Sequence, residues 1–153
     1  MAKQNPIEEI QKDINTHLFD TTNLQECLAA VKENYWNIQF IQSPDKEVQL
    51  EAVKQNICSI LFIRDPDKEV QLFVVRKDGW NIQFIHSPDK EVQLAVVNRN
   101  GKFIRYIHNP DKEVQMAAIE QSGYDIEVIA MCPNWEEFAE EIYTNRVIKD
   151  IIE

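Results

Sequence analysis

The chain has 153 residues, of which 44% are hydrophobic and 27% charged, and its formal net charge is −10. This composition is typical of a folded globular protein and excludes an intrinsically disordered one. The excess of acid disfavours a general binder of duplex nucleic acid, because such binding needs Lys and Arg to neutralise phosphates. No apolar run approaches the roughly 18 residues that cross a bilayer, and the N-terminus lacks the apolar core of a signal peptide. We therefore expect a cytoplasmic protein without a membrane partner.

The first element is a predicted N-terminal cap over residues 1–20, where apolar residues recur at helical spacing at Ile7, Ile10, Ile14 and Leu18. A repeat then dominates the chain: PDKEVQL occurs at residues 44–50, 66–72 and 88–94, and PDKEVQM at residues 110–116, which is a spacing of 22 residues. A weaker copy begins at Thr21. We predict five repeats over residues 21–130 and a helical C-terminal cap over 131–153, all in one domain of residues 1–153.

Each repeat predicts two short helices. We expect the residue before each proline to cap the first helix, with proline in the first helical position, where its missing N–H is harmless. The four predicted caps are Ser43, Asp65, Ser87 and Asn109. Gly79, Gly101 and Gly123 should end that helix in the left-handed conformation. Ile57 replaces glycine in the second repeat, so we expect Asn56 to adopt that conformation or the turn to differ. A strand over Ile57–Ile63 is the competing prediction.

A single 22-residue helix pair cannot bury its apolar face, so the copies must stack on one another. The predicted fold class is all-α, an α-solenoid of five helix-turn-helix repeats with helical caps. Its core should contain two isoleucine columns, Ile38, Ile60, Ile82, Ile104, Ile126 and Ile41, Ile63, Ile85, Ile107, Ile129. Helical geometry also turns the recurring glutamines inward, where a buried amide needs backbone partners in the neighbouring repeat, and a row of recognition residues is the alternative. These are Gln49, Gln71, Gln93 and Gln115.

On these motifs the chain resembles a bacterial and phage repeat family of the form N-P-x-x-E-V-Q-L-A-A-V-x-x-N-G, and more remotely leucine-rich-variant and HEAT-like repeats. The resemblance covers about residues 21–130. It implies a solenoid used for binding and brings no catalytic residues. Tyr35 and Ile57 in place of glycine, and the absence of proline from the first repeat, depart from the family pattern.

Function should lie in the positions that vary between repeats. The middle repeats carry basic residues there, with Phe73 as a candidate exposed anchor, and Arg plus aromatic residues often concentrate binding energy. The predicted binding residues are Phe73, Arg76, Lys77, Arg99, Lys102 and Arg105, with Arg64 nearby. The alternative is a solvated basic face that balances neighbouring acids. A second candidate is the aromatic row Trp36, Phe40, Phe62, Trp80, Phe84 and Tyr106, for which core packing competes with stacking on single-stranded bases.

An enzyme is not expected. His86 and His108 are equivalent residues one repeat apart, too far from each other to share a metal, and His17 lies in the N-terminal cap. The sequence from Asp65 to Glu69 lacks the glycine and distal glutamate of a calcium loop. Cys27, Cys58 and Cys132 are distant from one another and should be reduced thiols in the core. We expect no cofactor.

We therefore predict a non-enzymatic repeat protein that binds a protein partner, as a monomer or a homodimer. One alternative is an acidic inhibitor of phage or mobile-element origin that occupies the nucleic-acid site of a host nuclease or defence protein. Its residues would be Glu136, Glu137, Glu140 and Glu141. A binder of single-stranded nucleic acid is a further alternative and is not favoured.

Overall fold

The computed structural model describes residues 21–152, and these residues form helices without any strand. Each of the first four repeats contains a ten-residue α-helix and a six-residue 3₁₀-helix, labelled η. In order these are α2 (Leu24–Glu33), η1 (Tyr35–Phe40), α3 (Lys46–Gln55), η2 (Ile57–Phe62), α4 (Lys68–Lys77), η3 (Gly79–Phe84), α5 (Lys90–Arg99) and η4 (Gly101–Tyr106). The fifth repeat contains α6 (Lys112–Gln121) and α7 (Ile126–Met131), and η5 (Trp135–Phe138) and α8 (Ala139–Ile152) follow.

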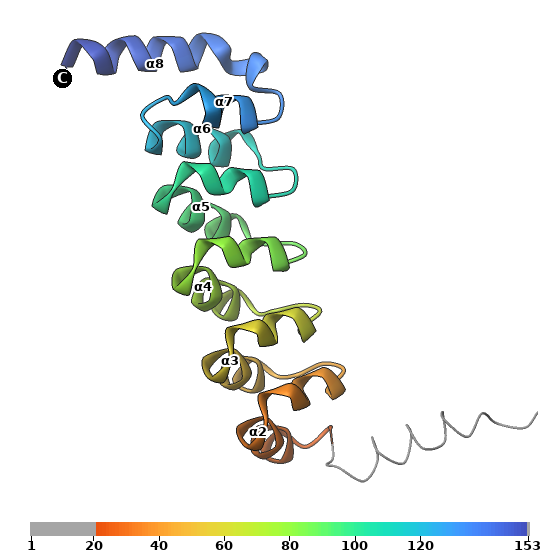
Figure 1. Ribbon diagram of the computed structural model, residues 1–153. Coiled ribbons are helices and arrows are strands. Elements are labelled where there is room, and N and C mark those ends of the chain that lie inside the picture. The colour runs from red at the N-terminus through yellow and green to blue at the C-terminus, as the bar shows by residue number, and fades with distance from the viewer. Residues whose placement is uncertain (1–20, 153) are drawn as a thin grey trace, which may run out of the picture. The chain divides into compact units, whose positions relative to one another are not determined.

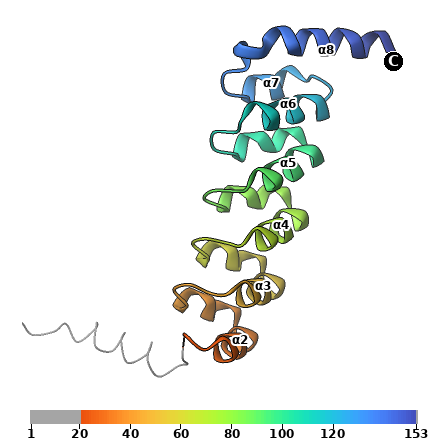
Figure 2. The same ribbon diagram turned by 180° about the vertical axis from the view of Figure 1, so that it is seen from behind.

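The all-α solenoid prediction is confirmed by serial packing of neighbouring repeats. The described residues divide into two compact units between Val70 and Gln71, within α4. In the first unit α2 packs on α3 and η1 on η2, and in the second α5 packs on α6 and η3 on η4. Within each unit the ten-residue α-helices lie on one side and the six-residue helices on the other (Figures 1 and 2). Whether both units form one repeat domain stays a prediction.

The second short helix expected in the second repeat is right and the competing strand at Ile57–Ile63 is wrong, because η2 occupies Ile57–Phe62. The predicted N-terminal cap lies outside the described residues, whereas the C-terminal cap is helical as expected. In the described part of the chain, none of the helices has both the length and the apolar character needed to span a membrane.

The predicted helix starts are displaced by two residues. The α-helices begin at Lys46, Lys68, Lys90 and Lys112, so proline precedes the N-cap instead of following it. Aspartate is itself a strong N-cap residue, and the carboxylate of Asp111 accepts a hydrogen bond of 3.0 Å from the Val114 N–H. Asn109, one of the four predicted caps, instead has a left-handed backbone with φ of 54°.

The predicted left-handed glycines are wrong at Gly79 and Gly101 and right at Gly123, which has φ of 68°. In the first four repeats the α-helix ends at an extended Asn or Asp whose side chain accepts the N–H two residues on and so starts the 3₁₀-helix. Asn56 is one of these, so the expected left-handed Asn56 is also wrong. Glycine is needed for space: a Cβ at Gly79 would lie 2.7 Å from the Phe103 ring, and one at Gly101 would collide with the Ala118 carbonyl.

The core follows the predicted columns except in the last repeat. Every isoleucine of the two columns from Ile38 to Ile107 is buried. Ile126, however, is 75% exposed, because Gly123 and Tyr124 both have positive φ and delay the second helix until Asp125 caps it. Val128 takes the buried place.

Candidate functional site

The recurring glutamine makes backbone hydrogen bonds, and at Gln49 and Gln71 these reach the next repeat. Gln49 donates from Nε2 to the Pro44 carbonyl at 2.8 Å, and its Oε1 accepts the Asp67 N–H of the next repeat at 2.9 Å. The Oε1 of Gln71 accepts the Asp89 N–H in the same way at 3.1 Å. Gln93 and Gln115 donate to Pro88 and Pro110. The repeated amide therefore holds the scaffold together.

The lysine that begins α3, α5 and α6 is likewise paired with acidic side chains. Lys46 contacts Glu69 of the next repeat at 2.9 Å, and Lys90 contacts both Asp111 and Glu113. The hydrogen bonds to Glu69 and Glu113 are the main causes that raise the pKa of Lys46 and of Lys90 above its usual value. The pair of Lys112 and Glu141, 2.5 Å apart, extends this pattern into α8. These charges are paired within the protein.

Three of the predicted binding residues form an exposed basic surface, defined here as Arg76 and Lys77 at the end of α4 and Arg99 at the end of α5. Arg99 donates from Nη1 to the carbonyl of Arg76 at 3.0 Å, which holds the two helix ends together. Lys77 Nζ lies 5.6 Å from the centre of the Phe73 ring. Phe73 is half-buried, so it borders this surface instead of projecting from it.

The basic surface is not neutralised by acidic side chains. Within residues 21–152, no carboxylate lies within the 4.0 Å of an ion pair from any of the three cations. Cations at helix C-termini are stabilised by the helix dipole, which explains how they are tolerated there. Because the three side chains are also exposed, their charges are available to a binding partner.

Arg99 also has a structural task that sequence reasoning missed. The last carbonyls of an α-helix lack intrahelical partners, and Arg99 satisfies one of them in α4. Gln55, at the equivalent position of the second repeat, does the same for α2 by donating to the Val31 carbonyl at 2.9 Å. Both repeats carry a side chain with an N–H donor at this position, and that shared feature could have predicted the contact. Only one donor of the Arg99 guanidinium is used in this way.

Lys102 and Arg105 belong to a different surface from the other predicted binding residues. Both lie on η4, on the short-helix side, where Lys102 Nζ contacts Glu127 at 3.0 Å and Asp125 at 3.8 Å. The bond to Glu127 is the main cause that raises the pKa of Lys102. Arg105 Nη2 approaches Met131 Sδ at 3.5 Å. The six-residue patch predicted from the sequence is thus divided between the two sides of the repeats.

The aromatic row is partly exposed, so the core-packing interpretation is wrong for Trp36, Trp80 and Phe84. Trp36 packs on Phe62 and Trp80 on Tyr106, each with ring centres 5.0 Å apart. The rings therefore pack on one another across neighbouring repeats, and Trp36 and Trp80 stay partly exposed.

The remaining candidates do not assemble into a site. Glu136, Glu137 and Glu140 are exposed, but Glu141 is paired with Lys112. In residues 21–152, no group of three His, Cys, Asp or Glu side chains is placed to hold a metal. Asp67 and Glu69 are used in the start of α4 and in the pair with Lys46, and His17 lies outside the described residues.

The cysteines are free, as predicted, and Cys27 and Cys132 are buried. Burial raises the pKa of the Cys132 thiol to about 11. Cys58 is exposed, so its expected core position is wrong.

The fold defines the chain as a helical-repeat protein of the solenoid class. Comparisons with protein-family models, with curated proteins and with solved structures found no match. The proposed function therefore rests on the contacts of this chain.

Proposed function

We propose that the protein is a non-enzymatic binding module whose basic surface of Arg76, Lys77 and Arg99 recognises an acidic segment of a partner protein. The observation that supports this most directly is the contrast between two kinds of cation. The recurring Lys46, Lys90 and Lys112 are paired with acids of neighbouring elements. The basic surface occupies positions that vary between repeats, and its charges have no such partner in the described residues.

A protein segment fits this surface better than a nucleic acid does. Three cations can neutralise only a few phosphates, and the rest of a chain with net charge −10 repels a polyanion. The half-buried Phe73 ring beside Lys77 adds an apolar contact that a peptide side chain can use. An acidic peptide of few charges therefore meets attraction at the surface and limited repulsion elsewhere.

The proposal is tested by selecting binders from a displayed library of random peptides on the wild-type chain. Peptides rich in Asp and Glu are expected, because a guanidinium binds carboxylates with charge-assisted hydrogen bonds. Their affinity should fall at least about tenfold, or 1.4 kcal/mol, when Arg76, Lys77 and Arg99 are all changed to Gln. Glutamine at Arg99 retains a donor for the Arg76 carbonyl, as Gln55 does for Val31.

The matched control changes Lys32, Lys54 and Arg146 to Gln, which removes equal charge from exposed positions outside the basic surface. Equal loss of affinity in both variants would show a diffuse charge effect and would contradict the proposal. Selection of basic peptides that depend on Glu136, Glu137 and Glu140 would favour the acidic inhibitor instead. Preferential binding of single-stranded nucleic acid would favour the third alternative.

A further inference from the structure

One side of α8 exposes five apolar side chains, with Glu140 and Thr144 on the same side in its N-terminal half. Tyr143, Val147 and Ile151 follow one another at intervals of four residues, and Ile148 and Ile152 lie beside them on the same side of the helix. All five side chains are exposed, with Ile151 at 77% and Ile152 at 78%. The opposite face of the helix carries Ile142, which is buried. We call the five exposed residues the α8 stripe.

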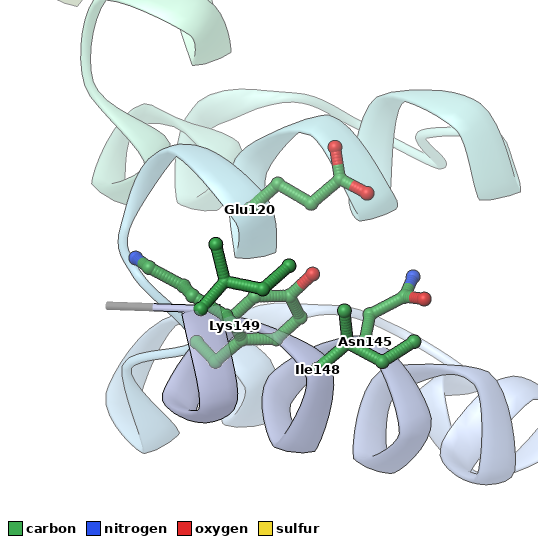
Figure 3. Close-up of a pocket in the computed structure, with 6 residues that line it drawn as sticks. Glu120, Asn145, Ile148 and Lys149 are labelled. Atoms are coloured by element: carbon green, nitrogen blue, oxygen red, sulfur yellow. The ribbon is translucent and has the colours of Figure 1, made fainter.

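A groove continues the α8 stripe toward the fifth repeat. It has a volume of about 500 Å³ and lies between α8 and the region where α6 ends. Figure 3 shows Ile148 and Lys149 of α8 facing Glu120 of α6 across this space. Tyr124, Asn145 and Ile152 complete the lining. The exposed apolar residues therefore border a groove that can accommodate side chains of another helix.

We propose that the α8 stripe is the dimer interface of this protein, with α8 of a second copy packed against it in antiparallel orientation about a two-fold axis near Val147. Covering the five exposed apolar side chains of the α8 stripe removes their surface from water, which favours association. An apolar stripe is self-complementary, as a two-fold interface requires. Two copies would bury roughly 1,000 Å² of total surface, which is at the lower limit for a specific interface.

The charges around the α8 stripe favour the antiparallel arrangement. Glu140 lies at the N-terminal end of α8, in line with Tyr143 and Val147. Parallel helices would place the two Glu140 carboxylates against each other. Antiparallel helices crossing near Val147 separate these carboxylates by about 20 Å along the axis. The repulsion is thereby removed without any change in the apolar contacts.

A lipid surface is the less suitable occupant. Helices that lie on membranes usually combine an apolar face with an excess of Lys and Arg, which attract anionic lipids. The chain has a net charge of −10, and the polar residues of α8 include Glu140, Glu141 and Asp150 beside Arg146 and Lys149. An apolar contact between two acidic chains should instead be unchanged or strengthened by salt, which screens their repulsion.

Sedimentation equilibrium of the whole chain tests the proposal, at low and at moderate salt. Wild type should show a reversible monomer–dimer equilibrium that salt does not weaken. Ile151→Glu should raise the dimer dissociation constant at least about tenfold. Ile126→Glu is the matched control, because Ile126 is 75% exposed on α7 and does not line the groove, and it should leave the constant unchanged. Both side chains are exposed, so neither variant should fail to fold.

Two results would overturn the proposal. One is a wild type that is monomeric at all concentrations, whether or not it cosediments through α8 with phosphatidylserine vesicles, and the other is an equal effect of the two substitutions. Orientation is tested by disulfide formation in a Cys58→Ser background, since Cys58 is the exposed cysteine of the described chain. Val147→Cys should cross-link the dimer and Glu140→Cys should not. The reverse pattern would contradict the antiparallel arrangement.

Discussion

The second repeat and the fifth repeat carry the same glutamine in different surroundings. Gln49 is satisfied at both ends, by the Pro44 carbonyl and by the Asp67 N–H. Gln115 donates to Pro110, but its buried Oε1 has no partner in the described residues. The position that corresponds to Asp67 is Pro133, which has no N–H to donate. Pro133 therefore leaves the Gln115 oxygen without the backbone donor that Asp67 supplies to Gln49.

The isoleucine of the second helix shows the same difference. Ile82 in the third repeat is 1% exposed. Ile126, at the equivalent position of the fifth repeat, is 75% exposed. The residue type is identical, so its contribution to stability depends on the backbone around it. The turn at Gly123 and Tyr124 delays the second helix, and Val128 is buried in place of Ile126.

The largest expected effect comes from this isoleucine pair. Ile82→Ala should reduce the free energy of unfolding by about 2–5 kcal/mol, because it leaves a cavity in the core. Ile126→Ala should change it by less than about 0.5 kcal/mol, as is usual for surface substitutions. Urea unfolding of both variants measures the difference. Similar losses in the two would mean that Ile126 is covered in solution.

The glutamine pair should give a smaller difference. Gln49→Leu removes the partners of the Pro44 carbonyl and the Asp67 N–H, so a loss of about 1–2 kcal/mol in the free energy of unfolding is expected. Gln115→Leu removes one bond and also an unpaired buried oxygen, and these effects should cancel to within about 0.5 kcal/mol. The same denaturant measurement applies. A larger loss at Gln115 than at Gln49 would show that its oxygen is satisfied in solution.

The cysteines give the smallest effect, on reactivity and not on stability. Cys132, in the turn after α7, is buried, and its pKa of about 11 keeps the thiol protonated at pH 8. Only the thiolate reacts with alkylating agents, so Cys58 should be labelled in the native chain well before Cys132. Mass spectrometry of partly alkylated protein identifies the site. Early labelling of Cys132 would show that the C-terminal end opens readily.

The raised pKa of Cys132 also makes the stability of the protein depend on pH. Folding favours the neutral thiol, so this contribution is fully present below pH 9, the usual pKa of the thiol, and is lost as the pH rises toward 11. Alkaline destabilisation over this range should be weaker in Cys132→Ala than in wild type.

Much of the fold could be predicted because the same pattern of apolar and polar residues recurs in every repeat. The spacing of 22 residues, the inward glutamines and the buried columns through Ile107 all agree with the structure. The helix starts were missed because both residues flanking each proline can act as caps, and local sequence does not decide between them. The glycines were misinterpreted because their reason is contact with Phe103 and Ala118 of the next repeat, which is a tertiary constraint.

The candidate site was predicted only in part for a related reason. Arg76, Lys77 and Arg99 were expected together and do lie together, since they share the ends of adjacent helices. Lys102 and Arg105 follow closely in sequence but lie on the short-helix side, where Glu127 and Met131 contact them. Arg99 and Lys102 are only three residues apart, so their positions in the sequence did not show that they lie on different surfaces.

The most direct test of the separation between scaffold and binding surface uses two variants of one helix, α4. Gln71 faces inward and accepts the Asp89 N–H, whereas Arg76 and Lys77 are exposed at the end of the same helix. The free energy of unfolding and the affinity for a selected acidic peptide would be measured for Gln71→Leu and for Arg76→Gln/Lys77→Gln. We predict that the first loses about 1–2 kcal/mol of stability and keeps its affinity, while the second keeps its stability and binds at least about tenfold more weakly. Full affinity in the second variant, or a parallel loss of both properties in either one, would contradict the account.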